Sequence, residues 1–439
     1  MISILPNIIF SFLLIISIGF FSLNIKKLIK VIKLGKPIDR FDNPSKRLSN
    51  MIRIALGQSK MVTKPISGIL HVVVYLGFII INIEVLEIII DGITGSHRFF
   101  SKIFNTYVYN FLIASFEIFA LLVLISVIIF WTRRNIVKIK RFLSSEMKGW
   151  PKFDADNILY FEVVLMLLFL SMNATDLILQ ERNYDNYYSA GSFPISTFLV
   201  PLFDSLSTSS VYYLERIFWW SHIIGIFFFL NYLYYSKHLH ILLAFPNTYF
   251  ANLEDKGKFN VLESVKNEVF LMFYPEKASQ NNQNIDKFGA SDVLDLNWVQ
   301  LMNAYSCTEC GRCTSECPAN ITGKKLSPRK IMMDTRDRLE KVSKNISINK
   351  GKFIDDGDRL LGNYISKEEL WACTSCNACV EACPINIDPL SIIMDMRQYL
   401  IMEESSAHPD LNNMMNNIEN NGAPWPYNQQ DRELWIQET

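Results

Sequence analysis

Cys307-Thr308-Glu309-Cys310-Gly311-Arg312-Cys313-Thr314-Ser315-Glu316-Cys317-Pro318 is the stretch that decides how the second half of this chain folds. The same spacing returns from Cys373 to Pro384, and the two runs contain all eight cysteines of the 439 residues. Three closely spaced thiolates followed by a Cys-Pro pair are typical of proteins with two [4Fe-4S] clusters, in which the fourth cysteine of each run ligates the other cluster. The expected ligand sets are Cys307, Cys310, Cys313 and Cys383 for cluster 1, and Cys373, Cys376, Cys379 and Cys317 for cluster 2.

Two other uses of these cysteines fit the spacing less well. Structural zinc sites usually combine two separated Cys-x2-Cys pairs instead of four thiols in one run. Disulfides need an oxidising compartment, whereas the positions of the basic loops put this segment in the cytoplasm. With every cysteine assigned to a cluster, no thiol nucleophile is left, and a self-contained disulfide reductase is disfavoured.

The first half of the chain has the composition of a membrane domain. Half of all residues are hydrophobic, and Phe, Ile and Leu are concentrated before position 245. Five stretches are long and apolar enough to cross a hydrocarbon core of about 30 Å as helices. The expected spans are 3–25, 65–90, 107–131, 157–180 and 215–243. A net charge of zero, from 43 basic and 43 acidic residues, gives no reason to expect nucleic acid as a partner.

Basic residues in two of the connecting loops orient the predicted bundle. The loop after the first span contains Lys26, Lys27, Lys30, Lys33, Lys36, Arg40, Lys46, Arg47, Arg53, Lys60 and Lys64. The loop after the third span contains Arg133, Arg134, Lys138, Lys140, Arg141, Lys148 and Lys152. By the positive-inside rule both loops are cytoplasmic, so the N-terminus lies outside and the cysteine runs lie in the cytoplasm. The first span lacks a basic n-region and a cleavage site, so we expect it to be retained.

These patterns predict a mostly α protein, in which a five-span bundle precedes an α-helical domain like a two-cluster ferredoxin. The expected domains are the bundle at 1–245, an amphipathic helix and linker at 246–290, the cluster domain at 291–402 and an irregular docking tail at 403–439. Apolar residues at helical spacing predict a helix over 260–274, followed by a polar run at 279–284.

Capping signals predict the helices of the cluster domain. Ser291 or Asp292 is expected to cap a short helix that runs through Trp298 into the first cysteine run. Ser327-Pro328 predicts the start of a helix, and the capping box Ser366-x-x-Glu369 predicts a helix that leads directly into the second run.

Five of the six histidines lie in or beside the predicted spans, where a polar side chain needs a partner or a function. His222 and His240 are 18 residues apart, so a continuous helix puts them on one face, about 27 Å apart along its axis. That places one imidazole near each membrane surface, as two stacked b haems require. His71 has the depth to pair with His240 around an inner haem, whereas His238 faces the other way and is expected to be interfacial.

The outer haem is less well defined by sequence. His97, which follows a loop with glycines, is the candidate partner of His222, although an ordinary exposed loop histidine is an equal alternative. Glu84 and Glu117 fall in the outer half of their spans, where buried acids commonly serve proton transfer beside a quinone. Hydrogen bonding to polar neighbours within the bundle is an equally good explanation of both carboxyls.

Two resemblances follow from these residues. The cysteine region closely resembles bacterial iron-sulfur oxidoreductases related to the C subunit of heterodisulfide reductase. The residues that carry this resemblance are 288–291, 303–313, 326–330 and 371–376. The membrane half resembles the cytochrome b subunit of respiratory nitrate reductase and the E subunit of heterodisulfide reductase in its five spans and in the places of His71, His222 and His240. The resemblance implies a multi-pass protein of the bacterial cytoplasmic membrane.

The chain departs from these families at two places. The nitrate reductase pattern has a further histidine in the second span, where this chain has Ile81. Related iron-sulfur oxidoreductases often continue into cysteine-rich repeats, whereas this sequence has no ninth cysteine before Thr439. The resemblance therefore implies a separate cytoplasmic partner, a cysteine-rich redox subunit or a flavoprotein.

The sequence thus favours the electron-transfer subunit of a quinone-linked oxidoreductase complex. It would pass electrons between the membrane quinone pool and a cytoplasmic partner through one or two b haems and two [4Fe-4S] clusters. The alternative is a haem-free membrane anchor that holds a two-cluster module for another enzyme.

Overall fold

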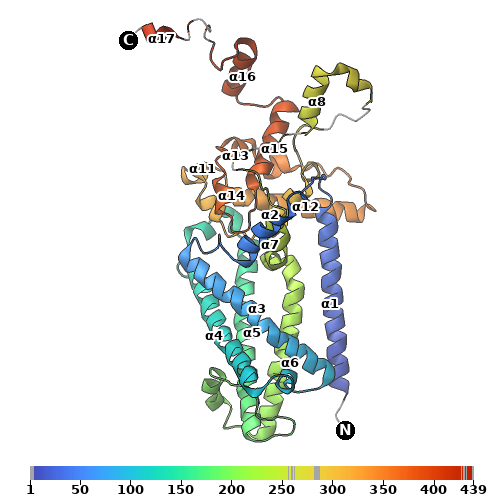
Figure 1. Cartoon of the computed structure of the whole chain (residues 1–439), viewed down its shortest axis with the longest axis vertical. Helices are drawn as coiled ribbons and strands as arrows, with labels where there is room; N and C mark the ends of the chain where they lie inside the picture. The colour runs from blue at the N-terminus through green and yellow to red at the C-terminus, as the bar shows by residue number, and fades with distance from the viewer. Residues whose placement is uncertain are drawn as a thin grey trace.

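The computed structural model describes residues 4–255, 257–258, 261, 263–280, 287–426, 428, 431 and 433–437. Within these ranges the chain is mostly helical, and its only β pairings are two isolated bridges. Figure 1 shows a bundle of long helices with a group of short helices at the end opposite the N-terminus. The expected fold class, a long-helix bundle followed by a small helical domain, is confirmed.

Five helices are long and apolar enough to cross a membrane. They are α1 (Leu5–Ile32), α3 (Pro65–Thr94), α4 (Thr106–Asn135), α5 (Trp150–Glu181) and α6 (Thr208–Tyr232), which a 3-10 turn, η6, extends to Tyr235. Proline in the first turn of α1, α3 and α5 costs no hydrogen bond, because the first helical N–H groups have no partner within the helix. Phe10, Ile113, Phe116, Phe169 and Ile223 form the fully buried core of the bundle.

The expected fifth span, 215–243, is not one continuous helix. Ser236 is extended (φ −113°, ψ 161°) and separates η6 from the turn η7 (Lys237–Leu239) and from α7 (His240–Tyr249). The Asp154 carboxylate accepts the backbone N–H of Lys237 at 3.0 Å, and the Ser236 hydroxyl accepts that of His238 at 3.1 Å. These side chains replace helical acceptors, so the prediction that His222 and His240 share one straight helix is wrong.

The cluster domain has a core of its own. Its helices are α9 (Trp298–Ser306), α10 (Arg312–Ser315), α11 (Pro318–Ile321), α12 (Pro328–Ile348), α13 (Lys367–Trp371), α14 (Ala378–Ala382) and α15 (Pro389–Met402). Leu301, Ile331, Leu339, Ile392 and Met396 from α9, α12 and α15 are fully buried together. At roughly 1.5–3 kcal/mol per buried side chain, this core explains how such short helices remain ordered.

The predicted capping signals were mostly correct. Ser327 caps α12, and the box formed by Ser366 and Glu369 begins α13. Asp292 caps only the short turn η9 (Val293–Asp295), after which Asn297 begins α9 with a second capping box. The helix expected from Asp292 through Trp298 is therefore two elements.

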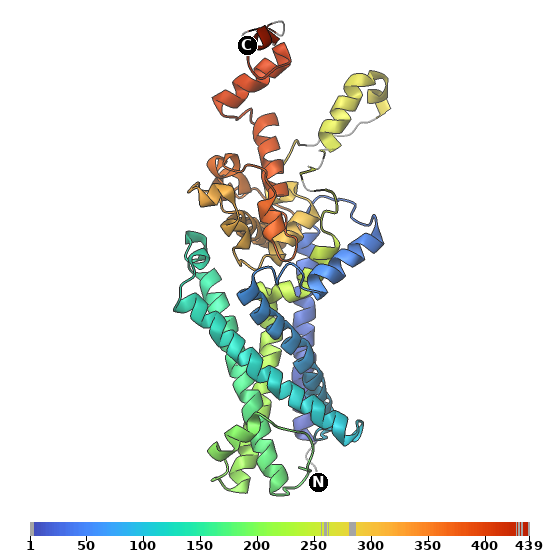
Figure 2. The same cartoon turned by 60° about the vertical axis from the view of Figure 1, so that its left-hand side comes forward.

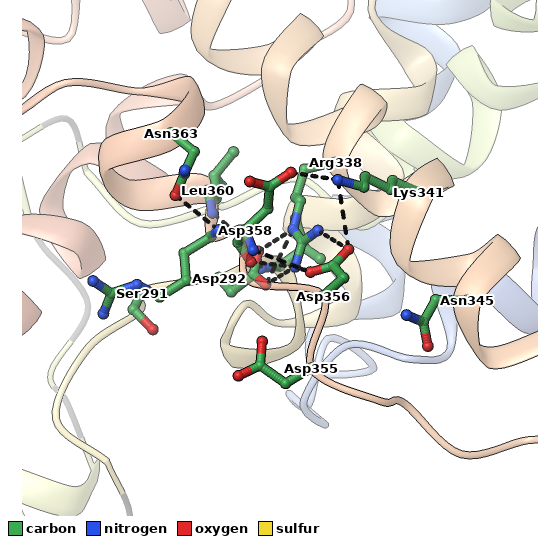
Figure 3. Close-up of polar contacts among 12 residues, drawn as sticks. Ser291, Asp292, Arg338, Lys341, Asn345, Asp355, Asp356, Asp358, Leu360 and Asn363 are labelled. Atoms are coloured by element: carbon green, nitrogen blue, oxygen red, sulfur yellow. Dashed lines mark hydrogen bonds and ion pairs between the residues drawn. The ribbon is translucent and has the colours of Figure 1, made fainter. Parts of the chain in front are cut away.

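A buried arginine ties α12 to the segments on either side of it. The guanidinium of Arg338 is fully buried and donates to both oxygens of Asp292 and of Asp356, at 2.6–3.1 Å. It also donates to the backbone carbonyl of Asp358 at 2.6 Å. Figure 3 shows the two carboxylates converging on this one side chain, with Lys341 beyond them. The fork of Arg suits this double pairing, which a lysine could not reproduce.

The cluster domain is packed against the end of the bundle that carries the basic loops (Figure 2). One apolar cluster crosses the boundary between them. It contains Leu28 and Ile32 at the end of α1, Leu243 of α7, and Val299 and Met302 of α9. Polar contacts add to it, since Arg329 donates to the carbonyl of Arg141 at 2.7 Å and to Glu146 at 2.8 Å. Bundle and cluster domain therefore share an interior.

The remaining helical elements of the described residues are all shorter than the five long helices. They are α2 (Pro44–Met51), α8 (Glu263–Phe273), α16 (Pro409–Asn421), α17 (Leu434–Gln437), η1 (Ile52–Leu56), η2 (Phe99–Lys102), η3 (Lys140–Phe142), η4 (Ser145–Met147), η5 (Ser196–Leu202), η8 (Pro275–Gln280) and η10 (Leu360–Tyr364). The expected amphipathic helix is present as α8, whereas 281–284 of the polar run lie outside the described residues. The tail is not irregular as expected, because Pro409 and the His408 cap begin α16, which buries none of its side chains.

Candidate functional site: cysteine loops and facing histidines

Each cysteine run lies in a loop between two short helices. The first run follows α9 and includes α10, and the second follows α13 and includes α14. Both loops turn left-handed twice, at Glu309 and Gly311 (φ 55° and 72°) and at Ser375 and Asn377 (φ 56° and 60°). Turns of this kind gather backbone N–H groups into concave surfaces that suit anionic centres. The Ser375 N–H already donates to the sulfur of Cys373 at 3.4 Å.

The loops bring the cysteines together in the crossed arrangement expected from the spacing. Cys307, Cys310, Cys313 and Cys383 line one hollow, which Cys379 also borders. Cys317 interacts electrostatically with Cys373 and Cys379 of the other run. Cys383 thus lies beside the first three cysteines of the first run, and Cys317 lies beside Cys373 and Cys379 of the second.

Burial distinguishes these thiols from reactive cysteines. Burial raises the pKa of the Cys307 thiol to about 12 and that of Cys383 to about 11. Such thiols are poor nucleophiles at neutral pH, but a bound metal would displace their protons. Cys376 differs from the other seven because it is exposed, so the second cysteine set has one side open to solvent.

His71 and His240 face each other where the bundle meets the cluster domain. Their ring centres are 6.5 Å apart, and the Nδ1 atom of His240 bonds the carbonyl of Lys237 at 2.9 Å. Two imidazoles that ligate one iron from opposite sides, at about 2 Å per metal–nitrogen bond, have ring centres roughly 6 Å apart. The bond from Nδ1 leaves Nε2 of His240 available, and Nδ1 of His71 is buried without a partner. The two imidazoles are therefore placed so that both could bind one metal-containing group between them.

His238 belongs to the same group, contrary to the prediction that it faces away as an interfacial residue. Because the chain breaks at Ser236, its ring lies 5.7 Å from that of His240 and 5.6 Å from that of Phe229, and its Nδ1 is buried without a partner. Burial lowers the pKa of both His238 and His240. A lowered pKa favours the neutral imidazole, which is the form that binds metal.

A chain of alternating charges connects this histidine segment to the first cysteine loop. Lys237 lies 3.9 Å from Asp154 of α5 and donates to Glu309 at 2.5 Å, and Glu309 in turn accepts from Arg336 of α12 at 2.9 Å. The Lys237 and Glu309 side chains are 11% and 3% exposed, so this is a buried ion pair. Burial alone would raise the pKa of Glu309, but the two cations outweigh this effect and hold it below its usual value.

The two distal histidines are not in contact with one another in any ring pair of the described residues. His222 is buried, its Nδ1 bonds the carbonyl of Leu165 at 3.1 Å, and its Nε2 has no partner. His97 instead directs Nε2 to the carboxylate of Asp176 at 3.2 Å, and its ring lies 4.5 Å from that of Tyr187 at a tilt of 51°. Each of the two histidines keeps one buried nitrogen without a partner, Nε2 of His222 and Nδ1 of His97, but His97 already uses its other nitrogen on Asp176.

Glu84 and Glu117 are both buried at this distal end, but their surroundings differ. Glu117 accepts from Asn173 at 3.2 Å and from the backbone N–H groups of Ile195 and Ser196 at 2.8 and 3.1 Å, which anchors η5. One oxygen of Glu84 has no partner, although the carboxyl faces the charges of Arg98, Glu87, Glu117 and Asp176. Only Glu84 has unused hydrogen-bonding capacity.

The fold and the cysteine loops define a helical protein with five potential membrane spans and a C-terminal iron-sulfur domain. Residues 306–387 match the family model of the 4Fe-4S dicluster domain. This match is the basis for assigning iron-sulfur clusters to the two cysteine runs.

Two curated proteins match nearly the whole chain. A probable iron-sulfur-binding oxidoreductase, FadF, from Bacillus subtilis is 29% identical over 94% of this chain and 58% of its own length. An EtfAB:quinone oxidoreductase from Syntrophomonas wolfei is 24% identical over 97% of this chain and 59% of its own length. The chain therefore spans about three fifths of these relatives.

Other matches cover a smaller part of the chain. The C subunit of a ferredoxin/F(420)H(2)-dependent CoB-CoM heterodisulfide reductase from Methanosarcina acetivorans is 29% identical over 26% of this chain and 56% of its own length. The expected likeness to the heterodisulfide reductase C subunit is thereby confirmed. No solved structure matches the chain significantly.

The sequence-based predictions omitted Lys237, Arg336 and Glu309 as site residues. One signal for Glu309 was available, because the repeated runs can be aligned and Ser375 occupies the equivalent place. Nothing in the sequence pointed to Lys237, since its position depends on the break at Ser236.

Proposed function

We propose that this chain is a membrane-embedded electron-transfer protein that links the quinone pool to a soluble redox partner. His71 and His240 would hold a b haem, and the crossed cysteine sets would hold two [4Fe-4S] clusters. These groups supply one-electron transfer when bound. The chain itself positions them, excludes water around the buried set and offers a partner surface at the exposed set.

The observation that carries this proposal is the pairing of His71 with His240 beside the cluster domain. The 6.5 Å between their rings suits one iron between them, and Lys237 contacts both His240 and the first cysteine loop. The Nδ1 atom of His71 is buried without a partner, and leaving such an atom unpaired costs about 1–3 kcal/mol, which a bound group could offset.

The quinone side is assigned to the distal end of the bundle. A quinone and its quinol differ by two electrons and two protons, so the site must exchange protons as well as electrons. The unpartnered carboxyl of Glu84 and the unpartnered Nε2 of His222 are the candidate groups for proton exchange and for an outer ligand. The name of the Syntrophomonas wolfei relative includes a quinone, which supports the choice of a quinone as the reactant.

The partner side is assigned to the second cysteine set, whose Cys376 is exposed. The partner would be a cysteine-rich redox protein or a flavoprotein, and the Syntrophomonas wolfei relative's name, which includes EtfAB, favours the flavoprotein. We also propose a cytoplasmic cluster domain and an external N-terminus, supported by the basic loops that contact this domain through Lys60, Lys64 and Arg141.

A reduced-minus-oxidised optical spectrum of the detergent-purified protein, with a pyridine-haem count and an iron count per chain, tests the proposal. The expected result is one haem from the inner pair, with a second only if His222 finds another ligand, and iron for two clusters. Addition of a short-chain quinol, or of its quinone to the reduced protein, should change the cluster EPR signals. Clusters without any haem would reject the proposal in favour of a haem-free membrane anchor.

A further inference from the structure

The two cysteine loops have the same spacing but differ in charge at one equivalent position. Glu309 and Ser375 each precede the second cysteine of their run, and both have a left-handed backbone (φ 55° and 56°). This conformation costs a non-glycine residue free energy, and glutamate offers no local compensation for it. Ser375 is neutral and contacts Met394 and Arg397 within its own domain.

Glu309 reaches out of its loop to two cations from different parts of the chain. One oxygen accepts from Lys237 at 2.5 Å, and the other accepts from Arg336 at 2.9 Å. Its side chain is 3% exposed, so water screens these charges weakly. A buried carboxylate held between two cations has a defined position and charge.

Lys237 is itself held by several partners. Its ammonium also donates to the carbonyl of Pro151 at 2.7 Å, and its backbone carbonyl is bonded by the Nδ1 atom of His240 at 2.9 Å. The Asp154 carboxylate that accepts its N–H is fixed in turn by the hydroxyl of Tyr232 at 2.7 Å. The lysine therefore joins the histidine segment to the first cysteine loop through rigid contacts.

We propose that Glu309, clamped by Lys237 and Arg336, is a positioning residue that sets the reduction potential of cluster 1 and orients its loop toward the His240 segment. This inference rests on the cluster assignment of the proposed function but not on the haem. Net charge and hydrogen bonding around a cluster tune its potential. A negative charge nearby disfavours an added electron, and a positive charge favours it.

Removal of the Glu309 charge and removal of the Lys237 charge must therefore shift the potential of cluster 1 in opposite directions. Glu309→Gln removes a negative charge with little change of shape, so the potential of cluster 1 should rise. Lys237→Met removes a positive charge, so that potential should fall, and the double variant should lie between the two single variants. Ser375 has no such network, so the potential of cluster 2 should remain at its wild-type value in all three.

The experiment is an EPR-monitored redox titration of the purified full-length chain, which resolves the two clusters. The matched control is Lys325→Met, which removes a lysine that pairs with Glu368 on the surface, where both side chains are more than half exposed. Lys237→Arg should retain the wild-type potential because it keeps the charge. If Lys237→Met does not accumulate, Arg336→Gln removes the other cation and must shift the potential in the same downward direction.

Several results would overturn the inference. Unchanged potentials would show that the charge of the Glu309 carboxylate does not affect cluster 1. Shifts of the same sign in Glu309→Gln and Lys237→Met would indicate loosened packing instead of charge. These titrations are independent of haem content, so a haem-free protein that shows the opposite shifts would reject the haem assignment while supporting this inference.

Discussion

His71 of α3 and His240 of α7 face each other across the end of the bundle with their ring centres 6.5 Å apart and their planes inclined by 44°. They are brought together by the break at Ser236, which turns the chain so that α7 begins at His240. The site therefore depends on a helix interruption as much as on the histidines.

Replacement of either facing histidine should remove the inner haem of the proposed function. We expect His71→Ala and His240→Ala each to lose one haem per chain, because a single remaining axial imidazole holds the iron weakly. The measurement is the pyridine-haem count beside the iron content of the clusters.

His408→Ala is the control, since this exposed histidine caps α16 far from the bundle and should leave the haem count unchanged. Full haem content in both His71→Ala and His240→Ala would contradict the ligand assignment.

Loss of the fourth cysteine of a run should remove the cluster of the other run. Cys383 lines the hollow formed by Cys307, Cys310 and Cys313, whereas Cys317 lies with Cys373 and Cys379. We expect Cys383→Ala to abolish the cluster 1 signal and spare cluster 2, and Cys317→Ala to do the reverse.

Both cysteine substitutions are made in the Glu309→Gln protein. In that protein the potential of cluster 1 is expected to be shifted, so the shifted EPR signal identifies cluster 1. Retention of the displaced signal in Cys383→Ala would show that each run binds its own cluster.

The sequence was a good guide to the local chemistry and a poor guide to what lies between distant segments. Cysteine spacing, the Ser366 and Glu369 capping box and the five apolar stretches are local patterns, so each could be predicted. The break at Ser236 could not, because it is stabilised by Asp154, a residue 82 positions earlier in the chain. The error about His238 followed from that single turn.

Arg338→Met should destabilise the cluster domain strongly. The substitution leaves Asp292 and Asp356 without their shared cation, and removal of one partner of a buried ion pair costs about 3–5 kcal/mol. The measurement is the melting temperature in detergent, monitored by the absorbance of the clusters.

Arg338→Lys should also lower this melting temperature, because one ammonium cannot reproduce the fork to both carboxylates. Lys325→Met, on the exposed surface, should not. Equal melting temperatures for Arg338→Met and wild type would contradict the importance of this network.

Acid should loosen the contact between the cluster domain and the loop from Lys140 to Met147. Burial would raise the pKa of Glu146, but its bonds to Arg329 and Ser327 hold it below the usual value. A depressed pKa means that the stabilisation is complete above the unfolded value of about 4.3 and is lost as pH falls through the folded value.

Hydrogen exchange of this loop, corrected for the intrinsic rate, should therefore accelerate below about pH 4. In Glu146→Gln the exchange should be faster at neutral pH and should lack this acid step. An identical acid step in both proteins would assign it to another group.

Glu84 and Glu117 should respond differently to the same substitution, although both are buried carboxyls of the distal bundle. Glu117→Gln leaves one oxygen where two now accept from Asn173, Ile195 and Ser196, so we expect a lower melting temperature with little effect on turnover in the surviving protein. Glu84 has an unpartnered oxygen, so Glu84→Gln should fold normally but slow quinone-linked electron transfer, with a changed pH profile because the amide cannot exchange a proton. The measurement is quinol-driven reduction of the protein across pH, beside thermal melting of each variant. Equal loss of stability in both variants, with unchanged pH profiles, would assign Glu84 to the scaffold and remove the distal carboxyls from the proton route.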